Sequence, residues 1–327
     1  MAAAVEAAPG EYVEAKLVFV LPSWRGKAVD KQVEEQYVPK MIYHAHPTRI
    51  CNARPQASEF SLAKNGFQLF RHEYGGPCDW ASEADVRAKY FPAMLKWAKE
   101  VMGASETLPI YHMYRDGGQS AYSRHGSHYT TFVHGDISPA IEWVGGCPES
   151  GDERPWPVAA GRHFAIVNFW RPTGGTPVQN HHLAILDPAT LRHEDVVPKE
   201  DVDDIDKSQH LRLVHSDGQR WLYFPHMMGD EVLAFTQYDT RQPAAAWRPT
   251  FHSAFRDPTC PAGAPARQSV EFRVLCLFGA DPEAERRRRD FFAQFSPLSR
   301  KFQQAKVPFT YHEQLAANVE GLARAKL

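Results

Sequence analysis

Neither sign of charge is in excess in this chain, and that lack limits its partners. Its 327 residues include 37 Lys and Arg against 39 Asp and Glu, which gives a formal net charge of −2. A protein without a basic surplus creates no field that attracts nucleic acid or anionic lipid. We therefore predict no nucleic-acid partner and no attachment to a membrane.

Cysteine is scarce, and long apolar runs are missing. The five cysteines are odd in number, widely spaced and form no Cys-x-x-Cys pair, which argues against a disulfide scaffold and a structural zinc site. No apolar stretch reaches the roughly 18 residues of a membrane span. Residues 1–6 lack the basic and apolar regions of a secretory signal. We expect a soluble, reduced, cytoplasmic protein.

Short strands dominate the middle of the chain. Between residues 107 and 280, apolar segments alternate with turns rich in Gly, Pro and Asp, a pattern typical of a jelly roll or barrel. The eight candidate strands are Ile110–Tyr114, Tyr129–Val133, His163–Trp170, His182–Leu186, Leu211–Val214, Trp221–Phe224, Val232–Tyr238 and Val270–Phe278. The acid-rich segment 194–206 is predicted to be an exposed insertion.

Helices are predicted on both sides of this β core. One helix begins at Ser82, an N-cap with Asp85 three residues later, and ends at Gly103, while Pro92 predicts a kink or a split. Residues 1–106 then form a tail, strands and this helix, residues 107–280 the core, and residues 281–327 two C-terminal helices. We interpret the whole as one decorated domain, mainly β, whose oligomeric state the sequence leaves open.

A His-x-Asp tripeptide suggests a metal site. In a strand, residues i and i+2 point to the same face, so His134 and Asp136 can reach one metal ion. They would supply two of the three ligands of a 2-His-1-carboxylate iron site, which leaves coordination positions open. A distant histidine must supply the third ligand. The candidates are His181, His182, His226 and His252.

The segment from Arg267 to Val274 alternates in polarity. Arg267, Ser269, Glu271 and Arg273 share one strand face, and Val270, Phe272 and Val274 share the other. An Arg with a hydroxyl two residues later can hold a carboxylate in a forked contact. The alternative is an exposed edge strand with an Arg–Glu pair. A histidine-aspartate pair, a remote histidine and then Arg-x-Ser is the order found in iron(II)/2-oxoglutarate oxygenases.

A further arginine follows an apolar strand. If Arg171 points into the barrel, it can anchor a carboxylate, and we predict Arg171 and Trp170 as substrate-binding residues. The opposite interpretation is an outward Arg171 stacked on Trp170. Both remain open at this stage.

Taken in order, these motifs resemble a known family. The chain resembles the fungal and bacterial group of gibberellin desaturase-like and cephem 7α-methoxylase subunit-like proteins, which are non-heme Fe(II)/2-oxoglutarate-dependent oxygenases. The matching segments are 60–62, 65–67, 90–92, 134–136, 168–172, 221–225, 230–232, 237–240, 252–255, 257–258 and 267–273.

The resemblance implies a fold, cofactors and site residues. It implies a double-stranded β-helix (jelly-roll, cupin-like) core in which His134, Asp136 and His252 bind Fe(II). Arg267 and Ser269 would hold the distal carboxylate of 2-oxoglutarate, with Arg273 as the substitute. The expected reaction uses molecular oxygen to hydroxylate, desaturate or cyclise a small molecule of specialised metabolism.

Three other functions use the same residues. The ligands could hold zinc and activate water in a cupin-like hydrolase, although no general-base carboxylate is evident. The iron enzyme could work without oxoglutarate, or the barrel could be a binding module without catalysis. Metal analysis separates the zinc hydrolase and the binding module from the iron enzymes.

Overall fold

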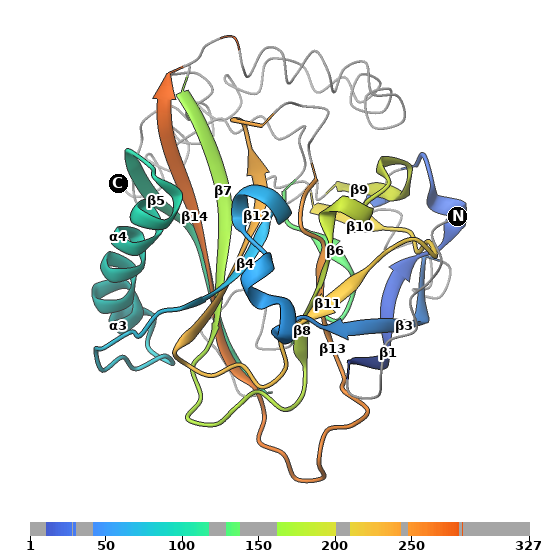
Figure 1. Cartoon of the computed structure of the whole chain (residues 1–327), viewed down its shortest axis with the longest axis horizontal. Helices are drawn as coiled ribbons and strands as arrows, with labels where there is room; N and C mark the ends of the chain where they lie inside the picture. The colour runs from blue at the N-terminus through green and yellow to red at the C-terminus, as the bar shows by residue number, and fades with distance from the viewer. Residues whose placement is uncertain are drawn as a thin grey trace, which may run out of the picture.

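Two β-sheets form most of the described structure. The computed structural model describes residues 11–27, 29–30, 42–117, 129–137, 162–200, 210–242, 248–280 and 283. The nine-stranded sheet contains, in spatial order, β1 (Tyr12–Val20), β3 (Tyr43–Asn52), β11 (Trp221–Tyr223), β8 (His182–Leu186), β13 (His252–Phe255), β6 (His134–Gly135), β10 (His210–Leu213), β9 (Val196–Glu200) and β2 (Val29–Asp30). The five-stranded sheet contains β4 (Phe67–Arg71), β12 (Glu231–Asp239), β7 (Arg162–Pro172), β14 (Gln268–Ala280) and β5 (Glu106–Asp116). The sheets form a nearly closed, barrel-like jelly roll, which confirms the predicted fold class (Figure 1).

The predicted strands match the observed ones with one exception. Tyr129–Val133 forms only an isolated bridge, from Phe132 to Val18, and regular pairing begins at β6. The ladder between β6 and β10 consists of only two residue pairs. The predicted C-terminal helices, residues 281–327, lie outside the described residues apart from Glu283.

The long helix predicted from Ser82 is present and interrupted. It consists of α3 (Glu83–Asp85), a wider π-type turn η4 (Val86–Tyr90) and α4 (Phe91–Met102). The Ser82 side chain accepts a hydrogen bond from the Asp85 amide, and Gly103 ends α4 in a left-handed conformation. Pro92 has no amide hydrogen to donate to the preceding turn, which accounts for the interruption before α4. The remaining short helices are η1 (Pro22–Trp24), η3 (Arg54–Glu59), α2 (Leu62–Asn65), η5 (Pro188–Thr190) and η6 (His193–Asp195).

Alternation along β7 and β14 divides each strand between two environments. Val270, Phe272 and Val274 pack with α4 on the outer face of the five-stranded sheet, as predicted. On the other face, Leu275 and Leu277 of β14 join a cluster inside the barrel. A second inner cluster lies towards the opposite end of β7 and includes Trp170, Leu233 and Phe235. The polar residues of the candidate site lie on this inner face, between the two apolar clusters.

The acid-rich segment is not an exposed insertion where it is described. Asp195 is fully buried and accepts hydrogen bonds from Arg25 and from the Ser216 hydroxyl, and the chain continues into β9. Buried carboxylates require such partners, so Asp195 is part of the core and the prediction is wrong here. Residues 201–206 lie outside the described residues.

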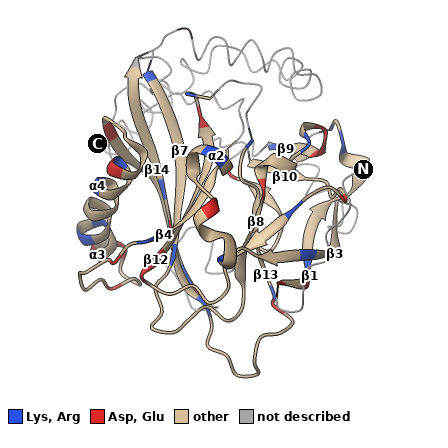
Figure 2. Cartoon of the chain, viewed as in Figure 1, with Lys and Arg blue, Asp and Glu red and all other residues tan. Residues whose placement is uncertain are grey.

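Charge is mixed over the described surface. Figure 2 shows Lys and Arg interspersed with Asp and Glu along the helices and over both sheets. None of the helices that the structure describes is long and apolar enough to cross a membrane.

Candidate metal centre

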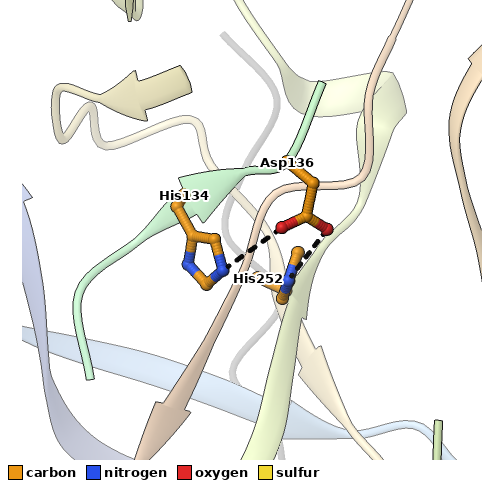
Figure 3. A group of neighbouring side chains, drawn as sticks. All are labelled: His134, Asp136 and His252. Carbon is orange, nitrogen blue, oxygen red and sulfur yellow. Dashed lines mark ion pairs between the residues drawn. The ribbon is translucent and has the colours of Figure 1, made fainter. Parts of the chain in front are cut away.

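Strand pairing brings the three predicted metal ligands together. His134 begins β6, Asp136 follows two residues later, and His252 at the start of β13 pairs directly with His134. The Nε2 atoms of His134 and His252 lie 3.7 and 3.6 Å from the two carboxylate oxygens of Asp136 (Figure 3). One ligand atom from each residue lies within 4.8 Å of the others. In the described part of the chain, this is the one such group of three or more His, Cys, Asp or Glu.

Each of the two histidines is oriented by the backbone carbonyl two residues before it. Nδ1 of His134 lies 3.0 Å from the carbonyl of Phe132, and Nδ1 of His252 lies 3.1 Å from the carbonyl of Thr250. A carbonyl can only accept, so each ring carries a hydrogen on Nδ1 and turns Nε2 towards the carboxylate of Asp136. Nε2 of His252 is buried without a hydrogen-bond partner. A metal ion would satisfy it.

Three buried side chains hold Asp136, two at its carboxylate and one at its backbone amide. Asn168 donates to Oδ2 at 2.6 Å, Arg273 pairs with Oδ1 at 2.9 Å, and the side-chain oxygen of Gln237 accepts from the Asp136 amide at 2.9 Å. Arg273 also donates to Asn168 and to Glu271. The sequence predicted Arg273 as a substitute co-substrate clamp, but its guanidinium is engaged here on the metal-ligand carboxylate. Asn168 and Gln237 were not predicted as site residues.

The charges of the site favour metal binding. Burial alone would raise the pKa of Asp136, but the positive charge of Arg273 beside it holds that pKa well below its usual range. Burial, reinforced by His252, holds the pKa of His134 well below its usual value. The carboxylate is therefore ionised and the imidazole neutral, which are the protonation states that bind metal.

The other candidate histidines lie elsewhere. His182 pairs with Asp257, with Nε2 3.4 Å from the carboxylate, and its ring is near that of His226. His181 packs against Tyr129 with the two rings tilted and their centroids 4.4 Å apart. The structure thus places only His252, among the four candidates, beside His134 and Asp136.

Arg267 and Ser269 lie at the start of β14. Arg267 is 4% exposed, with its guanidinium 4.2 Å from the ring centre of Tyr129 and 5.4 Å from that of Trp170. It donates from Nη1 to the carbonyl of His181, while its Nε and the hydroxyl of Ser269 are buried without partners. A cavity of about 250 Å³ reaches Arg267, lined by residues 174–178, 265–268 and 116. Burial lowers the pKa of Arg267 to about 9.

Arg171 faces away from the barrel. It follows Trp170 in β7 and therefore points to the outer face, where it donates to the ring and carbonyl of His72. Its guanidinium lies 5.6 Å from the ring centre of Tyr90, and not on Trp170. The inward orientation on which its substrate-binding role depended is therefore wrong. Trp170 itself points inward, towards Arg267.

Comparison with known proteins gives fungal relatives that match most of this chain. The chain is 28% identical over 290 residues to alpha-ketoglutarate-dependent dioxygenase phiK of a fungal species, covering 84% of this chain and 99% of the relative. It is 29% identical over 270 residues to hydroxylase/desaturase efuI of Hormonema carpetanum, covering 75% of this chain and 88% of the relative.

A solved structure and a family model agree with these relatives. The structure of iron and alpha-ketoglutarate-dependent endoperoxidase NvfI matches with a TM-score of 0.66 at 24% identity, over 83% of this chain and 99% of that one, which supports the same fold. The model of the oxidoreductase/YMDC permease-like domain matches residues 18–277. Because this match covers most of the chain, the protein belongs to the oxidoreductase/YMDC permease-like domain family.

Proposed function

We propose that the protein is a non-heme Fe(II)- and 2-oxoglutarate-dependent dioxygenase. The observation that carries the proposal is the facing set of His134, Asp136 and His252, with both Nε2 atoms directed at one carboxylate. Two imidazoles and one carboxylate form the ligand set of non-heme iron oxygenases, which leaves positions for a co-substrate and oxygen. Relatives whose names specify this chemistry, such as phiK, match over nearly their whole length.

The described residues fit both an iron ion and 2-oxoglutarate. The buried Nε2 of His252 has no partner without a metal ion, and Asp136 has the ionised carboxylate that iron needs. Arg267, directly before β14, and Ser269, within β14, each have a buried polar atom without a partner. A carboxylate held by both would satisfy these atoms, so we assign them to the distal carboxylate of 2-oxoglutarate.

Bound iron and 2-oxoglutarate would supply the oxidation of an unactivated C–H bond by oxygen, with succinate and carbon dioxide as co-products. The chain supplies geometry. Asn168, Arg273 and Gln237 fix Asp136, and the carbonyls of Phe132 and Thr250 fix the two imidazoles. Apolar clusters on either side of the ligands exclude water.

The substrate is proposed as a small molecule of specialised metabolism. Trp170 and Phe235 supply apolar surface in the inner cluster next to the ligands, and the ring of Phe235 lies 4.8 Å from that of His252. Within the wider class, we propose the gibberellin desaturase-like and cephem 7α-methoxylase subunit-like group, which the ordered motifs resemble. A cytoplasmic location and the absence of nucleic-acid and membrane partners remain predictions from the sequence.

Anaerobic titration tests the function directly. Adding Fe(II) and then 2-oxoglutarate to metal-free protein should produce the visible charge-transfer band of iron chelated by an oxo acid. His252→Ala should abolish the band, while His226→Ala, which removes a histidine away from the ligands, should retain it. Stoichiometric zinc in the purified protein, with no band, would instead support the hydrolase. Iron that supports turnover without an oxo acid would support the oxoglutarate-independent oxygenase.

A further inference from the structure

Two histidines have a backbone conformation that L-residues rarely adopt. Among the described residues, His181 (φ 52°) and His226 (φ 54°) are the non-glycine residues with positive φ. Such residues are strained, persist only where their surroundings hold them, and concentrate at functional sites. His226 lies on an exposed turn after β11, whereas His181 contacts Arg267.

The contacts of His181 show what its conformation achieves. Its carbonyl accepts a hydrogen bond from Nη1 of Arg267. Its ring packs on Tyr129, and Tyr129 in turn lies under the guanidinium and donates to the Arg267 carbonyl at 2.7 Å. The side chain of Asn180 accepts from the amides of both His181 and Asp257, at 2.8 and 3.0 Å. The turn is therefore held from both sides with its carbonyl directed at the guanidinium.

Arg267 depends on these neutral contacts. It has no carboxylate partner among the described residues, and the groups placed around its guanidinium are the His181 carbonyl and the rings of Tyr129 and Trp170. A long side chain has many rotamers, and fixing one of them has an entropic cost. A carbonyl on Nη1 fixes the guanidinium and leaves other donors, Nε among them, for a carboxylate.

We propose that His181 is a positioning residue for Arg267, and that its left-handed backbone orients the guanidinium towards the distal carboxylate of the oxo acid. This inference rests on the proposed function. It assigns the role to the backbone of His181 more than to its ring, because the contact with Arg267 is made by the carbonyl.

Substitutions that differ in their tolerance of positive φ separate backbone from ring. Glycine adopts φ near +50° without strain, whereas a β-branched residue does not. His181→Gly should therefore bind 2-oxoglutarate within about threefold of the unaltered protein, and His181→Val about tenfold or more weakly. The matched control is His226→Val, which introduces comparable strain on the exposed turn after β11, whereas the hydrogen bond from Arg267 goes to His181.

The readout is the dissociation constant of the anaerobic Fe(II) protein for two oxo acids. In 2-oxovalerate a methyl group replaces the distal carboxylate, so positioning of Arg267 affects 2-oxoglutarate alone. We expect His181→Val to weaken 2-oxoglutarate and leave Fe(II) and 2-oxovalerate affinity unchanged. If His181→Val does not fold, His181→Ala compared with His181→Gly gives the same contrast.

Two results overturn the inference. One is 2-oxoglutarate affinity in His181→Val equal to that of His226→Val. The other is an equal loss for both oxo acids, which indicates general damage to the fold. Failure of the unaltered protein to bind either oxo acid is a different result, because it overturns the proposed function itself.

Discussion

Arg273 neutralises a buried metal ligand, and replacing it should destabilise the metal-free protein. Nη2 of Arg273 lies 2.9 Å from Asp136, and the two side chains are 8% and 5% exposed. Two unit charges at this distance attract by about 6 kcal/mol at an effective dielectric constant of about 20. Much of this attraction offsets desolvation, and breaking one partner of a buried pair typically costs about 3–5 kcal/mol.

Arg273→Met retains an unbranched apolar chain and removes the charge. For a protein of this size, the loss corresponds to a lower Tm of the metal-free protein by about 6–10 °C, at about 2 °C per kcal/mol. A divalent cation on Asp136 would replace the missing positive charge. Adding Fe(II) under anaerobic conditions should therefore raise the Tm of Arg273→Met more than that of the unaltered protein.

Arg171→Met is the matched control for this comparison. Arg171 is also buried, at 1% exposure, but it contacts His72 and Tyr90 on the outer face. Its replacement should lower Tm without enlarging the response to Fe(II). The reasoning is refuted if metal-free Arg273→Met is as stable as the unaltered protein, or if Fe(II) raises the Tm of both variants equally.

Three further predictions concern other residues of the barrel. His252→Ala should abolish turnover and lower iron content with the fold intact, and retention of full iron by elemental analysis would contradict the ligand assignment. Arg267→Ala should raise the apparent constant for 2-oxoglutarate about thirtyfold to several thousandfold, from a loss of about 2–5 kcal/mol, and Arg267→Lys should recover only part of it. Burial, opposed by Asp257, lowers the pKa of His182 to about 4. The unfolded chain therefore binds the extra proton, and stability present above pH 6.5 is lost as pH falls towards 4, by up to about 1.4 kcal/mol per pH unit. Urea unfolding of metal-free His182→Gln should show a shallower pH dependence, and an unchanged slope would contradict it.

Alternation in the sequence was sufficient to predict much of the barrel. The segment 267–274 has a polar face and an apolar face, and the structure places them inside the barrel and under α4 respectively. The same logic failed for Arg171 because one sequence does not show which face of β7 is the inner one. One polar residue does indicate the inner face, because Asn168 interrupts the apolar run from Phe164 to Trp170. Asn168 contacts Asp136, so the even-numbered residues of this part of β7 face inward. Arg171 at an odd number then faces outward.

The residues that hydrogen-bond to Asp136 could not be predicted from the sequence, for a different reason. Asn168 lies on β7 and Gln237 on β12, 32 and 101 residues from Asp136 along the chain. A buried amide has no distinctive spacing, and its role depends on which strands become neighbours. Gln237 lies at a bulge between β12 and β7, where the pairing shifts between Thr236 and Tyr238. Such irregularities direct a side chain towards a site and are not visible in strand periodicity.

Gln237 links the two ligand segments, and this makes it a test of how the site is held. The residue is fully buried; its side-chain oxygen accepts from the Asp136 amide, and its side-chain nitrogen donates at 2.9 Å to the Thr250 carbonyl, which also faces Nδ1 of His252. Gln237→Met keeps the shape, leaves the Asp136 amide unsatisfied at about 1–3 kcal/mol, and removes one of the two donors to the Thr250 carbonyl. Residues that hydrogen-bond to metal ligands typically contribute about 10- to 100-fold in metal affinity, so Fe(II) binding should weaken within that range.

Gln219→Met is the control, because it removes a comparable hydrogen bond to the Val214 carbonyl and should leave Fe(II) affinity unchanged. Equal Fe(II) affinity in the two variants would show that the register of β6 and β13 alone fixes the ligands.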